Sequence, residues 1–196
     1  ITVHHAGALD VWAPFLGDAR FDLTSFQTES LPQNPAAVSW FQQVEASGRV
    51  IPVSFDETGM IGTGDQALAR GIVWSVYLGG ANFELHTFPL TDYRDFAGHL
   101  QDMRRARGFL EQLPFWEMRP MNSLLTSGQG YVFARSGQVY TAYLPSGGSI
   151  GLDLSSAAGD FSVEWFYPRD GTTQAAGVVS GGGARNFTAP NTQDWV

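Results

Sequence analysis

The 196-residue chain contains no cysteine and no lysine. Without cysteine it forms no disulfide, no thiolate metal site and no cysteine nucleophile. The absence of cysteine does not indicate whether the protein works in an oxidising or a reducing compartment. Its 11 arginines face 19 acidic residues, which gives a net charge of −8. Because binding a phosphate backbone requires clustered cations, we expect no nucleic-acid partner. The sequence also has no apolar run of about 18 residues, so we expect no membrane span.

An initiator methionine and a signal peptide are also missing before the first residue, Ile1. The last residues, Asp194 to Val196, have the pattern of the middle of a strand. We therefore expect the chain to be a piece of a longer protein. Hydrophobic residues make up 43% of it and charged residues only 15%, a composition that predicts a folded core.

Residues 1–118 alternate between strand and helix signals. Strands are predicted at 1–6, 21–28, 49–55 and 81–88, and a helical pattern follows each, at 9–16, 34–48, 65–79 and from 91 or 92 onward. This alternation predicts a parallel sheet with right-handed crossovers. Four such units fit either a small doubly wound domain or one half of an eight-unit barrel. No G-x-G-x-x-G loop follows a strand, so nothing indicates a dinucleotide site.

Residues 119–196 have a different pattern. From residue 128 onward no helix is predicted, and short alternating runs are separated by glycine-rich turns such as Gly181-Gly182-Gly183. Even strand spacing with such turns is typical of a small antiparallel β-sandwich. The charge divides as well, because residues 1–118 hold 14 acids and 7 arginines, whereas residues 119–196 hold 5 acids and 4 arginines.

Polar side chains follow each predicted strand of residues 1–118, at the ends where parallel α/β folds carry their sites. These candidates are His4 and His5, Gln27 and Glu29, Asp56 and Glu57, and Glu84 and His86. Glu57 is the sharpest of them, because a carboxylate directly after an apolar strand can attack an anomeric carbon or act as a base. A solvated loop acid, or a cap of the next helix, is the alternative for Glu57. Asp56 fits better as a hydrogen-bonding partner.

The remaining candidates have narrower roles. His4 and His5 are adjacent on a strand and point to opposite faces, so at most one contacts substrate and the two do not share a metal. We predict no metal and no cofactor. Trp12 is the one tryptophan considered as a sugar-stacking platform, because Trp40 and Trp74 lie within predicted helices.

Five segments carry a family resemblance: residues 51–59, 69–81, 109–118, 138–148 and 163–171. The first two resemble the second half of the barrel in glycoside hydrolases of the apiosidase-like class. The third is similar to that family's junction between its last barrel helix and a C-terminal β-domain. The last two resemble the small sandwich that carries the label of a collagen-binding domain. Together the segments extend the resemblance over nearly the whole chain.

The resemblance implies an α/β part followed by an all-β part. Residues 1–118 would be the C-terminal half of a (β/α)8 TIM barrel, strands five to eight, and residues 119–196 a β-sandwich. Glu57 would end strand seven as the nucleophile of a retaining glycoside hydrolase, and the acid/base would belong to a missing N-terminal half. The substrate would be a poly- or oligosaccharide, and the protein bacterial and secreted or periplasmic.

A half barrel exposes sheet edges and an apolar inner face, so we expect it to pair with its missing half or with a second copy. A different class of function stays open. In that alternative the chain is a non-catalytic module that binds carbohydrate or protein, and the barrel remnant is structural. A polysaccharide lyase is disfavoured, because Arg70 lies in a predicted helix instead of at a strand end.

Overall fold

The structure is a computed structural model that describes residues 4–5, 9–28 and 32–196. It divides into two compact units, Ile1–His99 and Leu100–Val196, and the division falls inside the helix α3 (Ala97–Leu110). Each unit is described by itself.

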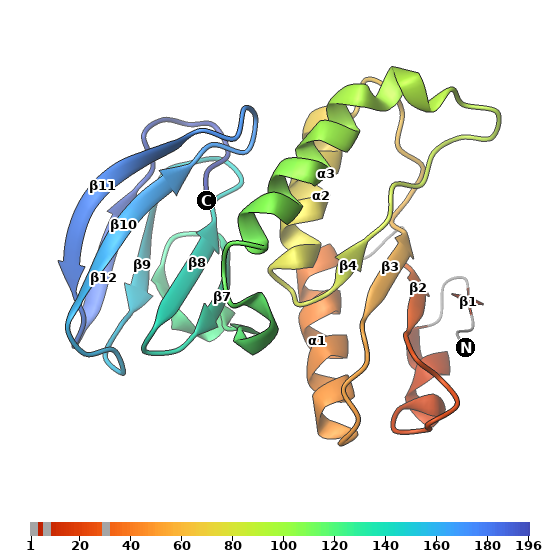
Figure 1. The fold of residues 1–196 in the computed structure, drawn as a ribbon, viewed down its shortest axis with the longest axis horizontal. Coiled ribbons are helices and arrows are strands. Elements are labelled where there is room, and N and C mark those ends of the chain that lie inside the picture. The colour runs from red at the N-terminus through yellow and green to blue at the C-terminus, as the bar shows by residue number, and fades with distance from the viewer. Residues whose placement is uncertain (1–3, 6–8, 29–31) are drawn as a thin grey trace. The chain divides into compact units, whose positions relative to one another are not determined.

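The first unit is built on a sheet of four short parallel strands in chain order. These strands are β1 (His4–His5), β2 (Ser25–Gln27), β3 (Ser54–Glu57) and β4 (Asn82–Phe83). The helices of the unit are η1 (Leu9–Phe15), α1 (Gln33–Ala46), α2 (Gln66–Tyr77) and η2 (Tyr93–Phe96), followed by the start of α3. Figure 1 shows α1 and α2 side by side on one face of the sheet.

Phe26 is the centre of an aromatic cluster that joins the sheet to the helices. Its ring lies 4.6 Å from that of Trp40 in α1 and meets Phe55 of β3 edge-on at 5.9 Å. Trp12 of η1 packs edge-on against Phe26 at 6.0 Å and donates its indole N–H to the carbonyl of Ser25 at 3.0 Å. Edge-on and offset aromatic pairs add to the free energy gained from burial alone. The cluster therefore fixes which face of the sheet is covered.

Helix α1 begins at Gln33, one residue before the predicted range, so Asn34 lies inside it. The side-chain amide of Asn34 donates to the carbonyl of Ser75 in α2 at 2.7 Å. A glycine then permits close contact between α1 and the end of α2, because a Cβ on Gly79 would lie 2.4 Å from the Cβ of Ala37. One buried hydrogen bond and one missing side chain thus set the packing of the two helices.

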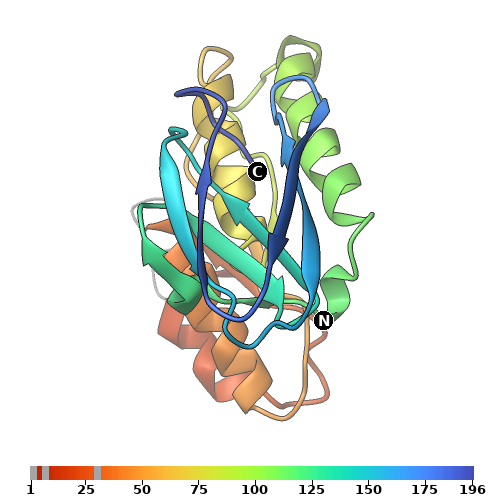
Figure 2. The same ribbon diagram turned by 90° about the vertical axis from the view of Figure 1, so that its left-hand side faces the viewer.

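The second unit is made mainly of antiparallel strands, seen from its own side in Figure 2. The strands are β5 (Arg119–Pro120), β6 (Leu125–Ser127), β7 (Tyr131–Arg135), β8 (Val139–Tyr143), β9 (Ser149–Asp153), β10 (Asp160–Phe166), β11 (Thr173–Ser180) and β12 (Ala184–Thr188). They form three separate sheets, in the orders β5-β7-β8, β12-β9-β6 and β10-β11. The short helix η3 (Phe115–Glu117) precedes β5, and the short helix η4 (Asn122–Leu124) lies between β5 and β6.

The core of the second unit gathers side chains from all three sheets. Its buried members include Val132, Leu144, Ile150, Leu152 and Trp165. The C-terminal segment contributes Trp195, whose ring stacks on that of Tyr167 at 4.7 Å. Several apolar side chains at the margin of this core stay half-buried, so one side of it is open.

The expected C-terminal half of a (β/α)8 barrel followed by a β-sandwich is wrong. The four parallel strands are only two to four residues long, and the described residues contain three α-helices. The segment expected as the first helix is a 3-10 helix that contains Pro14, which has no N–H to continue an α-helix. In the second unit, β8 and β10 do not pair with each other, so two continuous sheets are not formed.

The expected apolar inner face is wrong as well. Phe26, Phe55 and Phe83 lie on the face toward the helices, and strand alternation places their polar neighbours on the other face. The face of the sheet opposite α1 and α2 thus carries the polar side chains of β2 and β3.

We expect Phe26→Ala to lower the free energy of unfolding by about 3–5 kcal/mol, because it opens a cavity among three aromatic side chains. Urea denaturation measures the change. The control is Gln42→Ala on the exposed face of α1, for which we expect a change within about 0.5 kcal/mol. Similar destabilisation by both variants would contradict the central role of Phe26.

Candidate functional site

A β-bulge at the end of β3 brings two carboxylates to one edge of the parallel sheet. Phe26 pairs with Phe55, but the next residue of β2, Gln27, pairs with Glu57, so that Asp56 is the extra residue. The amide of Thr28 donates to the carbonyl of Glu57 at 2.6 Å and holds this register. Bulges commonly redirect side chains beside functional sites.

The bulge places both acids on the polar face. Ser25 alternates with Phe26 and therefore lies opposite the helices, and its hydroxyl donates to Oδ2 of Asp56. Gln27 is two residues further along β2 and shares the face of Ser25. Glu57, as the register partner of Gln27, lies on that face too. Both acids are half-buried. Without the bulge, simple alternation would turn Glu57 toward the helices.

Strand β4 extends this polar face. Asn82 pairs with Ser54, and Phe83 pairs with Phe55, so Asn82 and the following Glu84 lie on the face away from the helices. The amide of Glu84 donates to the carbonyl of Phe55 at 3.0 Å, which places Glu84 next to the bulge, and its side chain is exposed. The sheet thus brings together Gln27, Asp56, Glu57 and Glu84.

His86 lies beyond β4, where its carbonyl accepts the amide of Ile61 at 2.9 Å. Its side chain is half-buried, and its Nδ1 is buried without a hydrogen-bond partner among the described residues. The hydroxyl of Thr58, directly after Glu57, is likewise buried without a hydrogen-bond partner among the described residues. Unsatisfied buried polar atoms are uncommon in folded proteins, and a polar ligand is one explanation for them.

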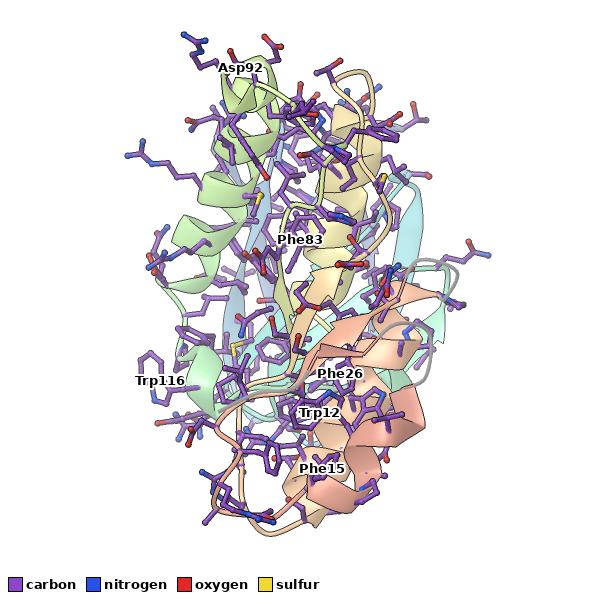
Figure 3. All side chains as sticks on the ribbon, turned by 90° about the vertical axis from the view of Figure 1, so that its right-hand side faces the viewer. Trp12, Phe15, Phe26, Phe83, Asp92 and Trp116 are labelled. Atoms are coloured by element: carbon purple, nitrogen blue, oxygen red, sulfur yellow. The ribbon has the colours of Figure 1, made fainter. Side chains whose placement is uncertain are left out.

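The other predicted site residues are not part of this arrangement. Trp12 is 1% exposed, so in this structure it offers no open ring face to a sugar (Figure 3). The backbone of His4 pairs with Ser25 and that of His5 with Phe26, but their side chains are outside the described part of the chain. Glu29 lies outside the described residues.

An exposed aromatic pair in the second unit was missed by the sequence analysis. Trp116 is 66% exposed and Phe115 43%, and their rings meet edge-on at 5.5 Å in η3. Beside them, Glu117 forms an ion pair with Arg135. The preceding Pro114 was the available signal, because it favours a short turn instead of a buried helix.

Neither a metal cluster nor a membrane span is found in the described residues. No three histidine or acidic side chains lie close enough there to hold a metal ion. No helix in that part of the chain has the length and apolar character needed to cross a bilayer.

One family model matches the chain, over residues 121–196, and its description is "Putative collagen-binding domain of a collagenase". The match lies within the second unit and covers its antiparallel strands from η4 onward. A comparison with curated proteins gives no match.

Two solved structures share the fold of nearly the whole chain. One, named "Glycoside hydrolase", has a TM-score of 0.70 and 16% identity over 93% of this chain and 53% of its own. The other is a glycoside hydrolase family 5 protein from Bacteroides vulgatus ATCC 8482, with a TM-score of 0.76 and 17% identity over 99% of this chain and 54% of its own. The chain thus spans about half the length of these structures and shares the fold of that half.

We expect Ser25→Ala to lower the free energy of unfolding by about 1.5–3 kcal/mol, because it removes a half-buried hydrogen bond to a carboxylate. The matched control is Ser39→Ala, on the exposed side of α1, with an expected change within about 0.5 kcal/mol. Urea denaturation compares the two variants. If they unfold alike, the Ser25–Asp56 contact does not order the polar face.

Proposed function

We propose that the chain is part of a bacterial glycoside hydrolase that acts on a poly- or oligosaccharide, with Glu57 as the nucleophile. The observation that carries the proposal is the bulge at Asp56, which holds Glu57 opposite Gln27 at the carboxyl end of a parallel strand. Carboxyl ends of parallel strands are where α/β enzymes carry their reactive groups. The likeness to two structures named as glycoside hydrolases supports this reaction class.

The neighbouring polar groups would bind the sugar. Gln27 and Asp56 flank Glu57, so their amide and carboxylate are suited to hydrogen bonds with ring hydroxyls. Glu84 is exposed beside the bulge and reaches outward. A hydroxyl both donates and accepts, which matches the unsatisfied Nδ1 of His86 and Oγ1 of Thr58. We include one of His4 and His5, and Glu29, as further candidates for the same edge.

A retaining hydrolase needs a second carboxyl group about 5–5.5 Å from the nucleophile. We propose that this acid/base comes from a part of the protein outside this chain, because the solved neighbours are almost twice as long. The apiosidase-like family is the finer assignment, resting on the residue segments of the sequence analysis. Its members' polysaccharide substrates would place the protein outside the cytoplasm, secreted or periplasmic.

The catalytic role is tested by Glu57→Gln in the complete protein. We expect the turnover of aryl glycosides to fall at least about 10³-fold, because the amide cannot attack the anomeric carbon. In Glu57→Ala, which leaves the space of the carboxylate empty, azide should restore part of the rate by forming a bond to the anomeric carbon as the aryl group leaves, and the glycosyl azide should have the inverted anomeric configuration. Initial rates and NMR of the product measure both effects.

The matched control is Glu111→Gln, which removes the same charge from an exposed ion pair with Arg107. We expect its rate and stability to stay unchanged, since surface pairs contribute little. Full activity of Glu57→Gln would remove the catalytic assignment.

A second candidate function, a carbohydrate-binding module, is favoured by the exposed pair of Phe115 and Trp116. A flat aromatic face suits the apolar face of a sugar ring, and the adjacent carboxylate and guanidinium of Glu117 and Arg135 suit its hydroxyls. The family label of residues 121–196 would instead assign the unit to collagen.

We expect Trp116→Ala to weaken binding to soluble polysaccharides at least about tenfold, as for other exposed aromatic anchors. Calorimetric titration against polysaccharide and against collagen measures the two ligands separately. The control is Tyr93→Ala, which removes a 54% exposed aromatic side chain of the first unit. A loss confined to collagen binding would contradict the carbohydrate role.

A further inference from the structure

Strands β8 and β10 each present a free sheet edge. β8 is the last strand in the order β5-β7-β8, and β10 belongs to a two-stranded ribbon in which both strands are edges. An edge strand carries a row of backbone N–H and C=O groups that its own sheet does not use. In the described part of the chain, no strand pairs with β8 or β10 along these edges.

The space between these two edges is an open cavity of about 670 Å³. Val139 to Ala142 of β8 border it on one side and Ser162 to Phe166 of β10 on the other. Several of the apolar side chains around it stay half-buried, including Tyr140, Ala142 and Phe161. The core of the unit is therefore incomplete where the two sheets should meet.

Trp195 and Val196 already bridge one end of this space. Trp195 exchanges two backbone hydrogen bonds with Leu144, the residue after β8, at 2.8 and 3.0 Å. Val196 exchanges two with Phe166, the last residue of β10, also at 2.8 and 3.0 Å. Figure 1 marks the C-terminus beside the end of β8. At this point the two edges are separated by the width of one antiparallel strand.

The hydrogen bonds at this end set the register for the rest of the gap. In antiparallel pairing, every second residue of a strand turns its N–H and C=O toward the same neighbour. Because Leu144 faces Trp195, Ala142 and Tyr140 face the gap as well. Because Phe166 faces Val196, Glu164 does too. A single strand turns the N–H and C=O groups of successive residues alternately to its two neighbours. The backbone groups of β8 and β10 that face the gap are placed to pair with such a strand.

We propose that the gap between β8 and β10 is a groove for one β-strand, and that its occupant is the polypeptide directly behind Val196 in a longer form of the protein. The first residue behind Val196 pairs with Ala142, the second with Glu164 and the third with Tyr140. This strand joins β5-β7-β8 and β10-β11 into one continuous sheet. A collagen triple helix does not fit the groove, because its chains have no free edge to offer a sheet.

The side chains of this strand alternate between core and solvent. Trp195 points into the core, so the first and third residues behind Val196 do so too, beside Ala142, Tyr140 and Trp165. The second residue points outward, as exposed Glu164 does. An extension with apolar residues in the first and third places therefore fills the cavity. An extension with polar residues in those places and an apolar residue in the second does not fill it.

The test adds short extensions behind Val196 of the 196-residue chain. One form carries Val-Thr-Val-Thr-Val, the second the out-of-phase Thr-Val-Thr-Val-Thr, and the third the flexible Gly-Ser-Gly-Ser-Gly. Hydrogen exchange at the amides of Tyr140, Ala142 and Glu164 is the readout. We expect the first extension to slow it at least about tenfold relative to the third, as a newly formed backbone hydrogen bond would. The out-of-phase form should give less protection.

The free Val-Thr-Val-Thr-Val peptide, added to the unextended chain, distinguishes a separate partner from a continuation of the chain. Equal protection by the free peptide would overturn the proposed occupant, as would protection that rises with protein concentration and so reports a second copy. Exchange that is the same in all three extended forms would overturn the groove itself. A gain in melting temperature confined to the in-phase form would support both.

Discussion

The packing of Phe26 between Trp12, Trp40 and Phe55 determines the rest of the first unit. Once these rings are buried together, strand alternation leaves only one face for Ser25 and Gln27, and the pairing of β2 with β3 carries the acids to the same face. Hydrophobic burial on one side thus positions the polar groups on the other. The packing of the aromatic cluster therefore positions the residues of the candidate site, although none of the site residues is part of that cluster.

The sequence allowed the parallel pairing and the strand-end position of Glu57 to be predicted, because both follow from local patterns. It did not reveal the bulge, which depends on how two distant strands pair and leaves no signal within either one. Trp12 was misjudged for a similar reason. An aromatic residue after a strand is compatible with a sugar platform or with a core, and only the indole hydrogen bond to Ser25 and the surrounding rings decide between them.

In the second unit, turns and alternation predicted most of the strands, but their assembly into sheets was beyond local reasoning. Sheet order depends on long-range hydrogen bonds, and here the decisive ones are made by the last two residues of the chain. Two residues suffice to hold β8 and β10 one strand apart at one end, but not to merge their sheets. The half-buried side chains along the gap are the physical result.

The bulge at Asp56 has a consequence for changes in chain length. Loss of the bulge with the chain length unchanged would turn Glu57 toward the apolar face of α1, where an unpaired carboxylate is strongly disfavoured. Deleting Asp56 would instead restore regular pairing and keep Glu57 opposite Gln27 on the polar face, without the carboxylate that accepts the Ser25 hydroxyl. Inserting a further residue would move Glu57 past Gln27. The bulge and its extra residue, Asp56, therefore have to be kept or lost together if Glu57 is to stay opposite Gln27.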